Sequence, residues 1–233
     1  MKLSIHQPSY FPWLGLLHKI AKSDVYMVMD DVQLSDSAYQ NRNIFLTSNG
    51  RVKYLTISVE RKGYLNKKFR ELLIADDGWR QQHRNFIINN YCKHPGFSEV
   101  MPKLDLFFES DYASLCEAVV ASMRLTMSMF DINTQVIFQS QMEYDEKSRK
   151  GDLVIDLIKA SGADVYLSGR GAREYLDETK FNQSIRLEYD IFNHPVYEQK
   201  GASDFVLGLS SLDALFNLGI TGAKNLLEMD AAS

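Results

Sequence analysis

Short apolar runs separated by amphipathic stretches dominate the beginning of the chain. Residues 3–6 (LSIH) and 24–31 (DVYMVMDD) are brief apolar runs, which are typical of strands buried in a sheet. Residues 15–23 (GLLHKIAKS) lie between them and carry their apolar side chains at helical spacing. A strand, a short helix and a second strand in this order predict a parallel pair joined by a crossover helix.

The middle of the chain follows a different pattern. Two strand-like runs at 44–47 and 52–59 flank the segment SNGR, and an Asn-Gly pair between such runs predicts a β-hairpin. Apolar residues recur at helical spacing over 79–91 and 112–130, which predicts two helices. We interpret residues 44–130 as a hairpin and helical insertion.

The last third returns to alternating strands and helices. The patterns predict strands at 135–139, 165–167 and 186–189, and helices at 150–160, 172–176 and 211–217. The expected fold is therefore α/β and Rossmann-like, a mostly parallel sheet flanked by helices with the hairpin and helical region inserted. Its length suits a single domain over residues 1–233.

Composition narrows the classes of function. The net charge of −4 does not indicate a nucleic-acid binder. The chain has no apolar run of about 18 residues that would indicate a membrane span, and the N-terminal residues lack the apolar core of a signal peptide. Cys92 and Cys116 are too few and too far apart for a disulfide framework or a zinc site. We expect a cytoplasmic protein with free thiols, and we assign no metal site.

Polar clusters follow three of the predicted strands. They are His6-Gln7, Asp30-Asp31 and residues 168–171 (SGRG), which begin with Ser168. In open parallel sheets, ligands bind beyond the carboxyl ends of the strands. Any one cluster could be an ordinary polar turn, and because neighbouring strand residues point to opposite faces, only one of the two aspartates is expected to face a pocket.

The turn after the first strand is rich in prolines and aromatic residues. Pro8 and Pro12 fix backbone torsions, so they stiffen this segment. Tyr10 and Trp13 offer flat apolar surfaces that could stack on a base or a sugar. The alternative is that the aromatic side chains fill the space between the sheet and the insertion.

The same turn is laid out like that of HIGH-type nucleotidyltransferases. Those enzymes also follow the first strand with a proline-containing turn, a His-x-Gly-His tetrad and a helix. Here the aligned residues are Trp13-Leu14-Gly15-Leu16, and the apolar Leu16 cannot hydrogen-bond a transferring phosphate. Nucleotidyl transfer is therefore the least favoured hypothesis.

Two further segments concentrate polar chemistry. Gln40, Asn41 and Arg42 place two side-chain amides beside a guanidinium, which could bind a phosphate or carboxylate and contact hydroxyl groups, or could form a self-bonded surface loop. Residues 194–199 (HPVYEQ) contain His194, Tyr197 and Gln199. Histidine suits proton transfer near neutral pH, so His6 and His194 are the two candidate acid–base groups.

These segments together resemble the WbqC-like protein family, bacterial proteins often associated with O-antigen and other surface-polysaccharide gene clusters. The resemblance covers nearly the whole chain in the expected order. It is carried by residues 6–15 (HQPSYFPWLG), 22–25 (KSDV), 30–33 (DDVQ), 40–43 (QNRN), 166–169 (YLSG), 175–176 (YL), 194–199 (HPVYEQ) and 209–217 (LSSLDALFN).

The resemblance implies work on nucleotide-linked sugars, with amide formation on an amino sugar. The expected activity is an acyl- or aminoacyltransferase of bacterial surface polysaccharide (O-antigen) biosynthesis, with a nucleotide-linked sugar as partner. No cofactor is firmly implied, and a thioester of an acyl carrier protein or of coenzyme A would be a reasonable donor. The alternatives are a non-catalytic nucleotide-sugar binding module and a nucleotidyltransferase variant.

Roles can be assigned to the candidate residues under this hypothesis. His6 or His194 would be the base, because amide formation needs a group to take the amine proton, and hydrogen-bond donors must hold the carbonyl oxyanion. Tyr10 and Trp13 would stack on the base, and Arg42 would bind the diphosphate. The remaining substrate contacts would be Gln7, Asp30, Gln40, Asn41, Ser168, Tyr197 and Gln199.

Overall fold

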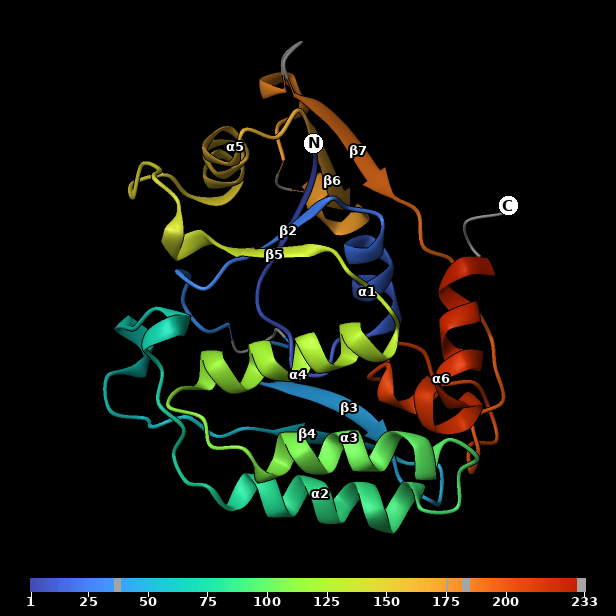
Figure 1. Cartoon of the computed structure of the whole chain (residues 1–233). Helices are drawn as coiled ribbons and strands as arrows, with labels where there is room; N and C mark the ends of the chain where they lie inside the picture. The colour runs from blue at the N-terminus through green and yellow to red at the C-terminus, as the bar shows by residue number, and fades with distance from the viewer. Residues whose placement is uncertain (36–38, 175, 182–184, 230–233) are drawn as a thin grey trace.

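The computed structural model describes residues 1–35, 39–174, 176–181 and 185–229. Its centre is a five-stranded parallel sheet, which confirms the predicted α/β class. The strand order is β5-β2-β1-β6-β7 (Figure 1). The strands are β1 (Lys2–His6), β2 (Val25–Val28), β5 (Gln135–Phe138), β6 (Val165–Gly169) and β7 (Arg186–Asp190).

Two helices and two cores enclose the sheet. Helix α1 (Leu14–Ala21) connects β1 to β2, and helix α5 (Lys150–Ser161) connects β5 to β6. Residues of β2 alternate between the cores: Tyr26 and Val28 pack with α1, whereas Val25 and Met27 pack with α5. This alternation follows from the two-residue period of a strand, and it shows that both faces of the sheet are covered.

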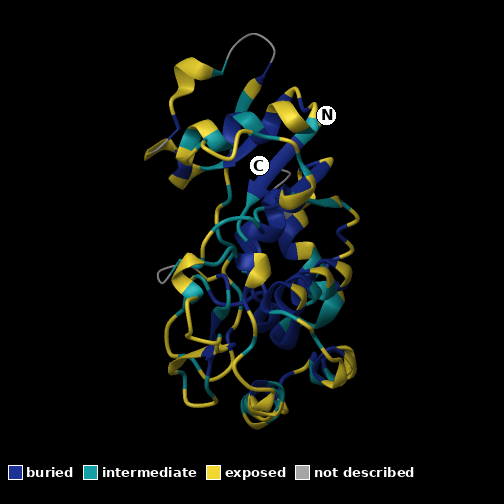
Figure 2. Ribbon diagram, turned by 90° about the vertical axis from the view of Figure 1, so that its left-hand side faces the viewer, coloured by how far each residue is buried: buried dark blue, intermediate teal, exposed yellow. Residues whose placement is uncertain are grey.

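The inserted elements lie between β2 and β5 in sequence. The hairpin consists of β3 (Arg42–Leu46) and β4 (Val52–Thr56), which pair only with each other among the described strands. Helices α2 (Gly78–Tyr91), α3 (Phe97–Glu109) and α4 (Leu115–Met129) stack beside this hairpin (Figure 1). Their inward faces are buried, while the outer faces are exposed (Figure 2).

The structure differs from the sequence prediction at two helices. Helix α3 contains Pro102 and was not predicted. Helix α6 (Leu212–Met229) was predicted only to residue 217, because Gly219, at φ 70°, interrupts the helical backbone. Within the segment predicted as helical at 172–176, residues 172–174 belong to a 3-10 helix over Arg170–Glu174, and residue 175 lies outside the described residues.

The turn after β1 is fastened by buried side chains from the rest of the fold. The amide nitrogen of Asn43 donates to the carbonyl oxygens of Tyr10 (3.1 Å) and Phe11 (2.7 Å). The hydroxyls of Ser210 and Ser211 donate to the carbonyls of Phe11 and Pro12, respectively. The backbone nitrogen of Phe11, a residue with the strained φ of 40°, donates to Ser122 in α4. We call this set of contacts the turn clamp.

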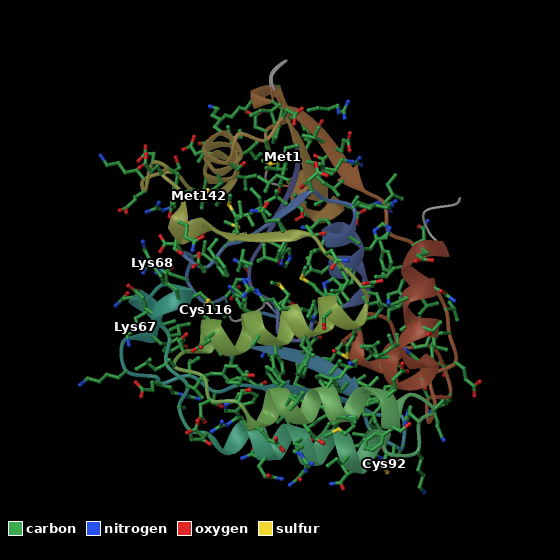
Figure 3. The ribbon with its side chains drawn as sticks, viewed as in Figure 1. Met1, Lys67, Lys68, Cys92, Cys116 and Met142 are labelled. Atoms are coloured by element: carbon green, nitrogen blue, oxygen red, sulfur yellow. The ribbon has the colours of Figure 1, made fainter. Side chains whose placement is uncertain are left out.

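The two cysteines are free thiols, and they lie at separate places in the fold (Figure 3). Cys92 is exposed at the end of α2, whereas Cys116 is buried at the beginning of α4. Within the described ranges, none of the helices combines the length and the apolar character needed to span a bilayer.

Replacing Asn43 with alanine is expected to destabilise the protein by about 2–4 kcal/mol, because it removes the side-chain donor to the Tyr10 carbonyl and one of the two donors to the Phe11 carbonyl. Urea denaturation followed by circular dichroism measures this loss. Asn85 is the matched control, since it is exposed on α2 and its side chain bonds Gln81 alone among the described residues, so Asn85→Ala should change the free energy of unfolding by no more than about 0.5 kcal/mol. Equal effects of the two substitutions would contradict the clamp.

Candidate functional site

The strand order places a topological switch point between β1 and β6. From this pair the order runs outward through β2 and β5 on one side and through β7 on the other. Connections that diverge in this way leave a crevice at the carboxyl ends of the two strands, where ligands bind in α/β proteins. Two cavities meet at this point, and both are lined by Ile5, His6 and Tyr166.

The first cavity, here the α1 cavity, lies beside α1 and has a volume of about 390 Å³. The second, here the α5 cavity, lies beside the beginning of α5 and has a volume of about 580 Å³. Both volumes fall in the range of small-molecule sites, roughly 300–1,000 Å³. The side chains that matter chemically in the α1 cavity are His6, Trp13, Lys19, Ser168 and Asp190, and those in the α5 cavity are His6, Gln7, Arg149 and Lys150.

His6 is the last residue of β1 and lines both cavities. Its Nδ1 lies 2.8 Å from the carbonyl oxygen of Gln7. A carbonyl only accepts, so Nδ1 carries the proton of the neutral ring and Nε2 carries the lone pair. Burial and the positive charge of Lys19 lower the pKa of His6 to about 4, against the hydrogen bond to Gln7, which raises it. His6 is therefore neutral at physiological pH and has the tautomer of a proton acceptor at Nε2.

Lys19 is a buried cation on the inner face of α1. Its ammonium donates to the carbonyl oxygen of Ile5 at 3.1 Å, and its exposed fraction is 5%. Burial lowers the pKa of Lys19 to about 8, and the negative charge of Asp190 opposes the shift. The sequence offered one signal for this residue, a lysine on the same helical face as Leu16 and Ile20, but we did not predict it as a site residue.

Asp190 ends β7 and lines the α1 cavity. Nδ1 of His18 lies 3.0 Å from its Oδ2, and this contact fixes the carboxylate against α1. Asp190 was not predicted from the sequence either, because a single acid at a strand end carries no motif. Its pairing with His18 connects residues 172 positions apart, which no local pattern can reveal.

Trp13 forms an aromatic wall of the α1 cavity. Its six-membered ring lies over Gly15, where a Cβ atom would come within 2.0 Å of the ring. The ring of Phe192 meets Trp13 edge-on at 6.2 Å between centroids. Gly15 therefore makes room for the tryptophan ring, which lines the cavity as expected for a stacking residue.

The α5 cavity carries positive charge. Arg149 and Lys150, which lie at the beginning of α5, line it together with Gln7. A neighbouring cavity shares Arg149, Val32 and Leu153 with it, and its wall contains Asp31. Burial raises the pKa of Asp31, but hydrogen bonds from Lys68, Arg70 and Tyr144 outweigh this effect and hold the pKa below its usual value.

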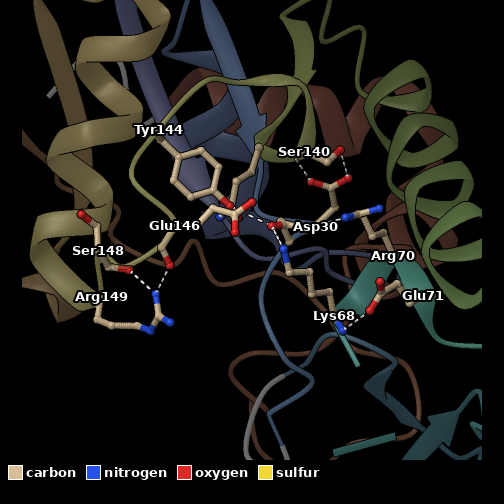
Figure 4. A network of polar contacts seen from close by, with 11 residues as sticks. Asp30, Lys68, Arg70, Glu71, Ser140, Tyr144, Glu146, Ser148 and Arg149 are labelled. Atoms are coloured by element: carbon tan, nitrogen blue, oxygen red, sulfur yellow. Dashed lines mark hydrogen bonds and ion pairs between the residues drawn. The ribbon is translucent and has the colours of Figure 1, made fainter. Parts of the chain in front are cut away.

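Asp30 fastens the loop that follows β5. Its two carboxylate oxygens accept from the backbone nitrogen (2.9 Å) and the hydroxyl (2.6 Å) of Ser140 (Figure 4). Both acceptors are thus used within the protein, and the carboxylate is buried. Asp30 lines neither of the two cavities and connects the end of β2 to the loop after β5, so its contact with a substrate stays a prediction.

The structure brings together four of the predicted site residues: His6, Gln7, Trp13 and Ser168 all line the two cavities. Tyr10 does not belong to this group. Its ring is fully buried and its hydroxyl lies 3.0 Å from Nδ1 of His83, so it offers no face to a ligand. The alternative reading, in which the aromatic residue fills the space toward the insertion, fits its position.

The polar side chains of the amide-rich loop, residues 40–42, also contact other parts of the protein. Oε1 of Gln40 accepts from the backbone of Ser35, and the amide of Asn41 donates to the carbonyl of Ile57. The guanidinium of Arg42 lies 5.0 Å from the ring centre of Tyr54 on the hairpin. These contacts place the three residues at and just before the inserted hairpin, and the cationic side chains that line the α5 cavity are Arg149 and Lys150.

The predicted segment 194–199 packs against α6. The hydroxyl of Tyr197 donates to Asp213, and the amide of Gln199 bonds both backbone groups of Val206. His194 donates from Nδ1 to the carbonyl of Pro195, and its ring lies 5.6 Å from that of Phe192. Phe192 lines the α1 cavity, whereas His194 does not.

Comparison with known proteins identifies the same resemblance as the sequence motifs. The model of the WbqC-like protein family matches residues 7–225. The chain is 30% identical over 221 residues to the uncharacterized protein Rv1507c of Mycobacterium tuberculosis, a match that covers 94% of each chain. No solved structure matches the chain.

The lowered pKa of His6 makes stability depend on pH. The unfolded ring binds a proton near pH 6.5 and the folded ring only near pH 4, so its contribution is fully present above about pH 6.5 and is lost as the pH falls to about 4. We expect the free energy of unfolding to drop less between pH 7 and pH 5 in His6→Gln than in the unsubstituted protein. Urea titrations at the two pH values measure this, and parallel profiles would contradict the assigned environment of His6.

Proposed function

The chain belongs to the WbqC-like protein family, and we propose that it transfers an acyl or aminoacyl group to the amine of a nucleotide-linked amino sugar. The observation that carries the proposal is the position of His6. A neutral imidazole with its lone pair on Nε2 stands where two cavities meet at the switch point of the sheet. When two substrates bind in adjacent cavities, a general base between the cavities can take the proton that the reaction releases.

The α5 cavity suits the nucleotide-linked sugar. Arg149 and Lys150 line it, and its described lining contains no carboxylate. Cationic side chains favour a diphosphate by charge-assisted hydrogen bonds, and the first amides of a helix favour it further. This assigns the diphosphate to the beginning of α5, and Gln7 in the same cavity is suited to contact sugar hydroxyl groups.

The α1 cavity then receives the acyl group. His6 Nε2 takes the proton from the attacking amine, the C–N bond forms, and the donor's leaving group departs. The hydroxyl of Ser168 lines this cavity, and its contact with the carbonyl of Gly169 is long at 3.4 Å, so it is suited to bond the acyl oxygen. A thioester of coenzyme A or of an acyl carrier protein supplies a sufficiently reactive donor.

The proposal places the reaction in the cytoplasm, in the assembly of a bacterial surface polysaccharide such as O-antigen. The motif resemblance supports this setting. The alternative in which the chain binds a nucleotide sugar without converting it predicts the same cavities and no product. The nucleotidyltransferase alternative predicts release of pyrophosphate, and the apolar Leu16 in the α1 cavity does not favour it.

Replacing His6 with glutamine is expected to lower the transfer rate about 10²–10⁴-fold, the range for losing a general base. The protein is incubated with nucleotide-linked amino sugars and acyl or aminoacyl thioesters, and the sugar product is detected by its gain in mass. His194→Gln is the control, because this histidine lines neither cavity and the variant should retain most of the activity. Binding of the sugar nucleotide without a mass gain in any pairing would exclude the transferase and leave the binding module.

Arg149→Gln is expected to weaken binding of a nucleoside diphosphate roughly ten- to a hundredfold, because it removes a charge-assisted contact. Isothermal titration with UDP and with uridine measures the effect, and only the UDP affinity should fall. Lys147→Gln in the same loop is the control, since Lys147 is exposed and does not line the α5 cavity. An unchanged affinity for UDP in Arg149→Gln would show that the diphosphate binds elsewhere.

A further inference from the structure

Two buried side chains of opposite charge line the α1 cavity without pairing directly with each other, and Arg170, which also lines it, is exposed. Lys19 projects into it from α1, and Asp190 faces it from the end of β7. Within the described residues, the ammonium of Lys19 donates to a backbone carbonyl and forms no ion pair with Asp190. Both side chains are buried, and a buried charge is costly unless a partner of opposite sign compensates it.

The ammonium of Lys19 has donors left over. It carries three N–H groups, and the described part of the chain uses one of them, toward Ile5. Although burial lowers its pKa to about 8, the group remains mostly protonated at pH 7. A ligand oxygen that carries negative charge, or that gains it during a reaction, would compensate this cation.

The carboxylate of Asp190 has an acceptor left over. His18 Nδ1 lies 3.0 Å from each of its two oxygens, but its single N–H donates to Oδ2. Oδ1 is buried and has no hydrogen-bond partner among the described residues. Asp190 lines the cavity, and a ligand ammonium bound beside it would satisfy Oδ1.

We propose that the α1 cavity binds a small α-amino acid, with its ammonium on Asp190 and its carboxylate on Lys19. The two charges of such a ligand are opposite in sign to these two buried side chains, which do not pair directly with each other. The walls contributed by Ile5, Leu16 and Phe192 are apolar, so they favour an amino acid with a small apolar side chain.

The next step rests on the proposed function. The amino acid bound in the α1 cavity then corresponds to the aminoacyl group that is transferred to the sugar. The sugar amine attacks the carbonyl carbon of an aminoacyl thioester, so that a C–N bond forms and the C–S bond breaks. His6 Nε2 takes the proton released by the amine and passes it to the departing thiolate. In the thioester, Lys19 holds the carbonyl oxygen in place of the carboxylate, and Asp190 keeps the α-ammonium protonated and away from the reaction.

The binding claim is tested on the unsubstituted protein with free ligands. Isothermal titration uses glycine, L-alanine, L-serine and L-valine, each compared with its carboxamide and its N-acetyl derivative. We expect saturable binding of at least one amino acid, and a loss of at least about tenfold when either charge is removed. Failure of every amino acid to bind at millimolar concentration, or equal binding of the uncharged derivatives, would overturn the proposal.

Substitutions test which residue binds each charge of the amino acid. Asp190→Asn should remove the preference for the free amino acid over its N-acetyl derivative, and Lys19→Met should remove the preference over the carboxamide. Lys22→Met is the control, since Lys22 is exposed at the end of α1 and does not line this cavity. Should a variant fail to fold, the comparison of derivatives on the unsubstituted protein still decides the question.

Different experimental results would contradict the amino acid site and the proposed transferase activity. Transfer of acetyl but not aminoacyl groups to the sugar would leave the transferase intact and contradict the amino acid site. Charge-dependent binding of an amino acid without transfer to any nucleotide-linked sugar would support the site and contradict the transferase.

Discussion

Hydrogen bonding of one buried turn determines where the site lies. The chain leaves β1 through a segment whose carbonyls at Tyr10, Phe11 and Pro12 cannot join a helix or a strand, and buried backbone groups are costly when left unpaired. Their donors come from β3 and from the segment that opens α6, and Ser122 of α4 accepts the Phe11 nitrogen. The inserted and C-terminal elements therefore hold His6 and Trp13 on either side of the turn.

This dependence explains which parts of the site the sequence could predict. Parallel strands appear as local apolar runs, and the rule that ligands bind at their carboxyl ends led to His6, Gln7 and Ser168, which line the cavities. The sequence left two interpretations of the amide residues open, because an amide beside a guanidinium looks the same whether it bonds a ligand or the backbone. Gln40 and Asn41 bond Ser35 and Ile57, and these partners become visible only in three dimensions.

Local sequence patterns also failed to reveal one of the helices and the two buried charges. Helix α3 was missed because Pro102 interrupts its pattern, although packing against α2 and α6 stabilises the helix in the fold. Lys19 and Asp190 carry no motif, and their significance comes from burial in one cavity, which requires α1 and β7 to be placed correctly. Secondary structure follows from short patterns, whereas compensation of buried charge follows from the assembled molecule.

Asp190, Lys19 and His6 in the α1 cavity are coupled in a definite direction. Burial lowers the pKa of Lys19 and Asp190 opposes this shift, while burial and the charge of Lys19 together lower the pKa of His6. The carboxylate thus favours the charged ammonium, and the ammonium adds to the effect of burial that keeps the imidazole neutral. A single cavity can then hold an anionic oxygen and present a free lone pair at the same pH, because its charges stand apart. Direct pairing of Lys19 with Asp190 would leave the ammonium less able to bind an anionic oxygen. It would also weaken the effect of the Lys19 charge on the pKa of His6, so both properties of the cavity depend on the separation of these two charges.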